Sequence, residues 1–95
     1  MIQKTSVLFV KASENYVEIF YSKNKTIQYE TFRNTLSAIN IQASFLHQCH
    51  RSYLVNLTTI KNVKGNSQNA KIEFHYHGLN IPLSKSYYNS IKSAL

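Results

Sequence analysis

Aspartate is absent from this 95-residue chain, and its four acidic residues are all glutamates. Serine and cysteine nucleophiles need a base that is itself oriented by a third group, often a carboxylate. Scattered glutamates are a poor source of that group, so the composition argues against a nucleophilic hydrolase. Tryptophan is also absent, and seven tyrosines and five phenylalanines supply the aromatic bulk.

Other scarcities narrow the class of protein further. Cys49 is the only cysteine, so no internal disulfide can form, which fits a reducing cytoplasm. The two glycines lie far apart, which excludes a glycine-rich phosphate loop. No run of about eighteen apolar residues occurs, and the N-terminus lacks the features of a secretory signal. We therefore expect a cytoplasmic domain that does not span a membrane.

Positive charge is what the chain has in excess. Eleven lysines and arginines against four glutamates give a net charge of +7 and a pI of about 9.7. This balance favours nucleic-acid binding, because cationic side chains release counterions from the phosphate backbone. A ribosome-associated protein, a membrane-surface protein or a basic protein without a specific partner are the alternatives. No two of these cations are adjacent, so they do not form a basic tail.

The hydrophobic pattern predicts a mainly β chain. Alternating and β-branched segments indicate about seven strands, at residues 5–11, 16–21, 26–30, 46–48, 60–64, 70–76 and 79–83, and residues 53–55 are expected to form a returning apolar stem. The first three are joined by connections too short for parallel crossovers, so we expect an antiparallel meander. Pro82 has no N–H to donate, which places the last strand at an edge or at its own end.

Two segments show helical spacing instead. Residues 31–39 are expected to form a helix with Thr31 as N-cap, on the spacing of Phe32, Leu36 and Ile39. A second helix is expected after Ser84, with an inward stripe of Tyr87 or Tyr88, Ile91 and Leu95. Asn56 can cap a helical turn over residues 57–60, because its side chain can accept from nearby backbone N–H groups.

The most unusual stretch is residues 45–57, FLHQCHRSYLVNL, which has Arg51 inside an apolar segment. Arginine is rarely buried without a partner, and this chain has few carboxylates. The apolar residues therefore predict a buried stem, with His50, Arg51 and Ser52 at the exposed tip of a turn. A basic tip on a buried stem can hold a side chain against a phosphate or a base edge. The plain alternative is an ordinary solvated loop.

Ligand types suited to zinc gather at one place, namely His47, Cys49 and His50. His75 and His77 also form an H-x-H pair on one face of a predicted strand. Structural zinc sites usually show paired C-x-x-C or H-x-x-x-H spacing, which this chain lacks. Glu73 with these two histidines could serve as the acid and base of a small ribonuclease, but such a set is more often a solvated strand edge. We predict no metal, no cofactor and no catalytic site.

The predicted loop tips suit nucleic-acid contacts better. Asn15, Arg51 and Lys85 lie at or beside predicted turns or helix starts, and asparagine and arginine have the forked donors that read adenine and guanine. The first turn of the last helix can bind phosphate through its free N–H groups, supported by Lys85 and Ser86. Rings that could stack on bases are those of Tyr16, Tyr53, Tyr87 and Tyr88, although the spacing of Tyr53 favours the core.

Three motifs follow one another along nearly the whole chain. They are VLFVKASENYVEIFY, then after a short amphipathic helix FLHQCHRSYLVNLTTIKNVK, and finally GLNIPLSKSYYNSIKSAL. The His-Arg-Ser-Tyr-Leu-Val-Asn run and the Ile-Pro-Leu-Ser-Lys run are the most specific parts. In this combination the sequence resembles the LytTR family of bacterial DNA-binding domains. The resemblance implies one domain over residues 1–95, with short antiparallel sheets and one or two short helices.

The resemblance also implies sequence-specific binding to double-stranded DNA. Three loops would enter successive major grooves, usually at direct repeats and often as paired protomers. In this sequence the loops would carry Ser13, Asn15 and Tyr16, then His50, Arg51 and Ser52, and finally Lys85, Ser86 and Tyr87. The family commonly has arginine where Lys85 stands. Lysine lacks the bidentate fork to guanine, so we expect Lys85 to contact phosphate.

Transcriptional control is the biological role that the resemblance implies, commonly as the output domain of a two-component response regulator. A receiver domain needs an acidic phosphoacceptor site, which a chain without aspartate cannot form. Such a domain would lie upstream of this sequence, or the chain acts as a stand-alone regulator. The residues alone leave two alternatives open: an RNA-binding or ribosome-associated basic β module, and a redox-sensing role for Cys49 in place of simple packing.

Overall fold

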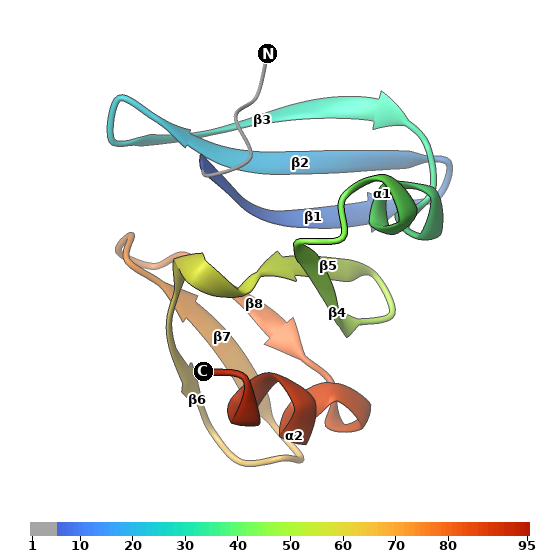
Figure 1. Ribbon diagram of the computed structural model, residues 1–95. Coiled ribbons are helices and arrows are strands. Elements are labelled where there is room, and N and C mark those ends of the chain that lie inside the picture. The colour runs from blue at the N-terminus through green and yellow to red at the C-terminus, as the bar shows by residue number, and fades with distance from the viewer. Residues whose placement is uncertain (1–5) are drawn as a thin grey trace.

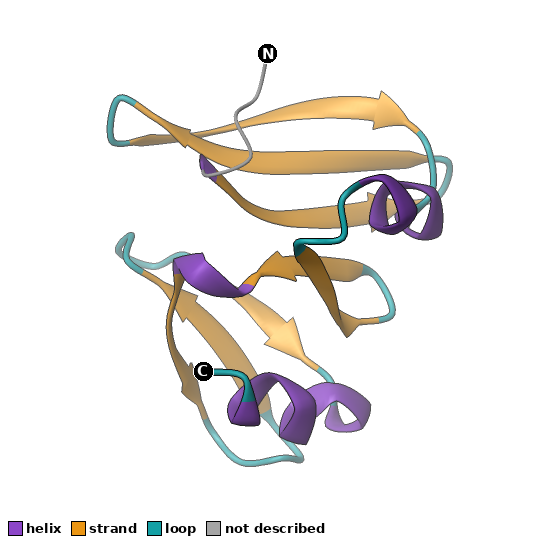
Figure 2. Cartoon of the chain, in the orientation of Figure 1, coloured by secondary structure: helices purple, strands orange, loops and turns teal. Residues whose placement is uncertain are grey.

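The computed structural model describes residues 6–95 and is mainly β, as the sequence predicts (Figure 1 and Figure 2). Its strands are β1 (Val7–Ser13), β2 (Tyr16–Lys23), β3 (Thr26–Arg33), β4 (Leu46–His50), β5 (Tyr53–Asn56), β6 (Ile60–Lys64), β7 (Ala70–Phe74) and β8 (Asn80–Leu83). Its helices are α1 (Leu36–Gln42), the 3₁₀ turn η2 (Leu57–Thr59) and α2 (Lys85–Ser93). None of the helices in this part of the chain is long and apolar enough to cross a bilayer. Thr5, where the first strand was expected to begin, lies outside the described residues.

The strands form two antiparallel sheets. β1, β2 and β3 make the predicted meander, and β1 also pairs with β5, which gives the order β3-β2-β1-β5-β4. The second sheet has the order β6-β7-β8. Pro82 lies in β8, an edge strand of this smaller sheet. A residue without an N–H is tolerated there, because one side of an edge strand has no neighbouring strand to pair with.

Two apolar clusters lie on opposite faces of the larger sheet. One fills the space between this sheet, the smaller sheet and α2, and Phe9 is at its centre. The Phe9 ring stacks on Phe20 at a centroid distance of 4.5 Å and on Phe74 at 5.4 Å, so one side chain joins both sheets. The second cluster lies between the other face and α1, and its fully buried members include Val10 and Val17. Side chains alternate along a strand, so Phe9 and Val10 face opposite clusters.

The corner between the two sheets depends on a buried polar side chain. Asn56, which is only 4% exposed, donates through Nδ2 to the carbonyl oxygen of Val7 over 2.8 Å. Its Oδ1 accepts from the backbone N–H of Thr58 at 3.3 Å and from the Thr58 hydroxyl at 2.9 Å. The predicted cap of the helical turn is confirmed, because Asn56 is the N-cap of η2. The same side chain therefore ties the start of β1 to the chain that crosses to the smaller sheet.

The first helix begins later than its spacing predicts, and the N-cap assigned to Thr31 is wrong. β3 continues through Arg33, so Thr31 and Phe32 are strand residues, as β-branched and aromatic side chains favour. Thr35 is the N-cap, and its hydroxyl accepts from the backbone N–H of Ala38 at 3.2 Å. The interval from Phe32 to the first turn of α1 matches a helical period only by coincidence.

Two C-terminal predictions are also wrong. β7 ends at Phe74, whose N–H donates to the carbonyl oxygen of Leu79 over 3.3 Å and closes a turn. His75 and His77 lie in that turn and not on one face of a strand. Leu95 lies beyond the end of α2 and is 56% exposed, so it does not complete the inward stripe of the helix.

Candidate nucleic-acid interface

The turn between β4 and β5 is the predicted basic tip. The backbone N–H of Ser52 donates to Nδ1 of His50 over 3.1 Å, which ties the ring to the turn. The His50 ring also meets Tyr53 edge-on, at a centroid distance of 5.5 Å and an interplanar angle of 78°. Arg51 is exposed between these two anchored neighbours. The His50 ring therefore holds the turn in place, and the exposed guanidinium of Arg51 is accessible to a ligand.

The turn between β1 and β2 lies directly beside this tip. Lys11 of β1 pairs with Tyr53 of β5, and one residue further the Ala12 N–H donates to the carbonyl oxygen of Ser52 over 2.8 Å. The turn itself is two residues long, because Ser13 pairs with Tyr16 across it. Asn15 is exposed in the turn, and the first residue, Glu14, has a left-handed φ of 53°. Non-glycine residues rarely adopt this conformation, so the tight turn is held by the pairing on both sides of it.

The start of α2 is the third element at this end. Ser84 is the N-cap, but its hydroxyl makes no cap bond and donates instead to the carbonyl oxygen of Cys49 at 3.4 Å. The Ser84 N–H donates to the same oxygen over 2.9 Å. Lys85 and Ser86 are exposed in the first turn of the helix, and Tyr87 is half-buried against the cluster around Phe9. The first N–H groups of α2 therefore have no partner from the capping side chain.

These contacts bring all the predicted site residues to one end of the molecule, on the right-hand side of Figure 1. The β1–β2 turn, the β4–β5 tip and the start of α2 follow one another along that side. They carry Ser13, Asn15, Tyr16, His50, Arg51, Ser52, Lys85, Ser86 and Tyr87. Seven of these are exposed or at the surface of a turn, while His50 and Tyr87 pack partly inward. Their role in contacting DNA stays a prediction.

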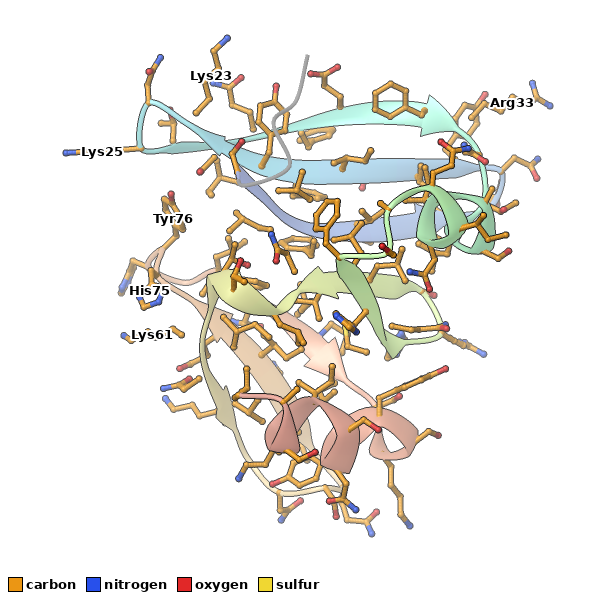
Figure 3. All side chains as sticks on the ribbon, in the orientation of Figure 1. Lys23, Lys25, Arg33, Lys61, His75 and Tyr76 are labelled. Carbon is orange, nitrogen blue, oxygen red and sulfur yellow. The ribbon has the colours of Figure 1, made fainter. Side chains whose placement is uncertain are left out.

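Arg33 lies at the same end and was missed by the sequence patterns. It is the last residue of β3, pairs across the strands with Tyr16, and is exposed. The next residue is tied to the neighbouring turn, because the Asn34 N–H donates to the carbonyl oxygen of Asn15 at 3.2 Å. Figure 3 shows the Arg33 side chain extending outward from this end of the sheet. Arg33 and Arg51 are the only arginines of the chain, so both lie at one end.

A second group of cations lies at the opposite end. Figure 3 shows Lys23 and Lys25 on the β2–β3 turn above Lys61 and His75, all on the left of the view. A hollow of about 440 Å³ near the β7–β8 turn is lined by Lys61, His75 and His77, among other residues. These side chains face away from the end that carries both arginines.

The histidines do not form a metal-ligand cluster within residues 6–95. No group of three potential metal ligands comes together in this part of the chain. Glu73 is engaged by Lys64, with 3.6 Å between its Oε2 and the lysine Nζ, and it lies on β7 while His75 and His77 occupy the turn. Glu73, His75 and His77 nevertheless line the same hollow near the β7–β8 turn.

A groove of about 750 Å³ runs between α1 and the two turns of the larger sheet. Its lining includes Glu14, Asn34, Asn40 and Arg51. The Asn40 side chain is anchored, because its Nδ2 donates to the carbonyl oxygen of Leu46 over 2.8 Å. The groove therefore separates α1 from the β1–β2 turn and the β4–β5 turn, and Arg51 is accessible from the groove.

Cys49 lies behind the tip and is fully buried, at 0% exposure. Burial raises the pKa of its thiol to about 12, well above the ordinary value of 9.0. Its Sγ is 3.9 Å from the carbonyl oxygen of Tyr53, which is within reach of a weak hydrogen bond. Reactive cysteines are exposed and have a lowered pKa, so these properties favour a packing role over redox sensing.

Comparisons with known proteins agree with this architecture. The model of the LytTr DNA-binding domain family matches residues 1–95. A solved structure described as the LytTr DNA-binding domain of a response regulator from Bacillus cereus has a TM-score of 0.79 and 18% sequence identity, and the match covers 97% of this chain and 83% of that one. The comparison with curated proteins gave no match. The similarity to the solved structure shows the fold, and the family match over the full length shows that the chain belongs to the LytTR family of DNA-binding domains.

Proposed function

We propose that this domain reads specific sequences of double-stranded DNA for a bacterial transcriptional regulator. The observation that carries the proposal is the convergence of three loops, from distant parts of the chain, at one end that also holds both arginines. Arg51 is the residue with the fork that matches the O6 and N7 acceptors of guanine in the major groove. Asn15 has the matching donor and acceptor for adenine.

Lys85 and the start of α2 have a different role in this proposal. Lysine is a point charge that contacts phosphate without the planar geometry of guanidinium. The backbone N–H groups of Lys85 and Ser86, at the start of the helix, add the positive end of the helix dipole beside it. Lys85 and Ser86 therefore position the domain on the backbone, while Arg51 and Asn15 read bases.

The loops lie in a row, which supports insertion into successive major grooves. The longest dimension of the domain is 35 Å, close to the roughly 34 Å of one turn of B-DNA. In this proposal two protomers bind a direct repeat in the same orientation and form a homodimer only on the DNA.

The regulatory setting is also part of the proposal. The structural relative comes from a response regulator, which supports an output domain controlled by an upstream receiver, and a stand-alone regulator is the other arrangement. Either form would act in the cytoplasm, where bacterial DNA is located.

Selection of bound sequences from a random duplex pool tests the proposal directly. The expected result is a short motif repeated in the same orientation about one helical turn apart. The Arg51→Ala variant, selected in parallel, should lose base preference at one position of each repeat. Failure to enrich any motif, or tighter binding to RNA or single strands than to duplex, would instead support the RNA-binding alternative.

A further inference from the structure

We propose that Arg33 is a fourth DNA contact, which binds a backbone phosphate at the outer edge of the footprint. This proposal rests on the proposed DNA-binding function of the same end of the molecule. Arg33 comes from a strand end and not from one of the three loops. Its location follows from the pairing of β3 with β2, which aligns Arg33 with Tyr16.

Arg33 is available for an anionic ligand. It is exposed, and the ion pair found within residues 6–95 joins Lys64 to Glu73, so no carboxylate engages Arg33 within 4.0 Å in that part of the chain. Glu14 lies in the adjacent turn without forming such a pair. An exposed guanidinium beside other basic groups gains energy from a shared polyanion, because each contact releases condensed counterions.

The fold of the sheet sets how far Arg33 lies from the central tip. β5, β1, β2 and β3 are consecutive neighbours, and adjacent strands are about 4.8 Å apart. Three such steps place Arg33 about 14 Å from the stem of Arg51. Phosphates repeat every 3.4 Å or so along one strand of B-DNA, so this offset corresponds to about four base pairs.

The register also distinguishes a phosphate from a base edge as the target. Arg33 is level with Tyr16 and Ser13, so it is set back behind the apex formed by Glu14 and Asn15. The chain then turns away into α1, held by the bond from Asn34 to Asn15. A residue recessed behind the turn that enters the groove reaches the rim of that groove, which is formed by the sugar-phosphate backbone.

The test measures DNA affinity as a function of salt for the full chain and its variants. Removing one phosphate contact by Arg33→Ala should lower the slope of log K against log salt by about 0.9 and weaken binding about eightfold at 0.1 M salt, for each bound protomer. The loss should be equal for specific and unrelated duplexes. Arg33→Lys keeps the charge and should restore most of the slope. Lys25→Ala removes the same charge at the opposite end and should leave the slope unchanged.

Shortening the duplex locates the contact. On a site cut back by about four base pairs on the Arg33 side, the wild type and Arg33→Ala should bind equally well, because the phosphate is gone from both complexes. Equal slopes for Arg33→Ala and Lys25→Ala, or a changed base preference in Arg33→Ala, would overturn the phosphate assignment. These outcomes leave the function of the domain intact. If the wild-type domain shows no sequence-specific binding to duplex DNA, both proposals are wrong.

Discussion

The backbone N–H of Ser84 and the carbonyl oxygen of Cys49 are 2.9 Å apart and join the start of α2 to the end of β4. The distance between Lys85 and Arg51 is therefore set by a backbone contact between the two sheets. A substitution at either side chain leaves that contact in place. Single variants at the interface thus report lost DNA contacts and not a changed arrangement of the loops.

Arg51→Ala is expected to weaken binding to the selected site by about 1–3 kcal/mol and to relax preference at one base pair. The reason is the loss of a bidentate fork to guanine, which no neighbouring side chain can replace. Fluorescence titration with the selected duplex and with single-base variants measures both effects. Lys23→Ala, which removes a charge at the opposite end, is the matched control. Unchanged affinity and unchanged preference in Arg51→Ala would remove Arg51 from the interface.

Lys85→Ala should behave differently, because a phosphate contact carries no sequence information. We expect affinity to fall by the same factor for specific and unrelated duplexes, with the salt slope reduced by about 0.9. Titrations at several salt concentrations check this. Lys85→Arg retains the charge and should retain the slope. A loss confined to the specific site would mean that Lys85 reads a base.

Asn56→Ala tests the junction between the sheets. The variant loses the donor to Val7 and the acceptor for Thr58 at a site that is almost fully buried, so we expect the free energy of unfolding to fall by about 2–3 kcal/mol. Chemical denaturation measures the change. Asn62→Ala, at an exposed position of β6, should stay within about 0.5 kcal/mol of the wild type. A similar result for both variants would show that the buried amide contributes nothing to the corner.

The pH dependence of stability tests the burial of Cys49. Its folded-state pKa of about 12 lies above the ordinary 9.0, so the unfolded chain loses its proton first as the pH rises. The contribution of the protonated Cys49 thiol to the free energy of unfolding is complete below pH 9. It is lost between about pH 9 and pH 12, at up to about 1.4 kcal/mol per pH unit. Cys49→Ala removes this dependence, and other titrating groups cancel in the difference. Parallel curves for both proteins between pH 8 and pH 10 would contradict a buried thiol.

The order of strands and turns could be predicted because each turn has a local cause. The β2–β3 turn, for example, needs left-handed backbone at Asn24 and Lys25, and the polar segment around them indicates a turn. The boundary before α1 could not be predicted. Thr31 and Thr35 are both suitable N-caps, and the choice between them depends on the pairing of β3 with β2. The pairing of two strands cannot be read from the spacing of apolar residues within one segment.

The arrangement of the site was even less accessible to residue patterns. Arg51 stood out because a cation in an apolar segment must reach the surface. Its proximity to Asn15 depends on the pairing of β1 with β5, and its proximity to Lys85 on the bond from Ser84 to Cys49. The three loops were grouped by resemblance alone. Arg33 was missed because the segment that contains it was assigned to a helix.

β1 lies between β2 and β5, and this position determines when the DNA-binding end of the domain forms during folding. The β1–β2–β3 meander is local and can form early, but pairing Phe9 with Val55 must close a loop that contains two strands, a helix and β4. Closing long loops costs entropy before any contact is gained, so this step is expected to set the folding rate. A nascent chain that stops before β5 has the first turn without the tip beside it. The β1–β2 turn and the β4–β5 turn are therefore expected to come together late in folding, in the single step that pairs β1 with β5.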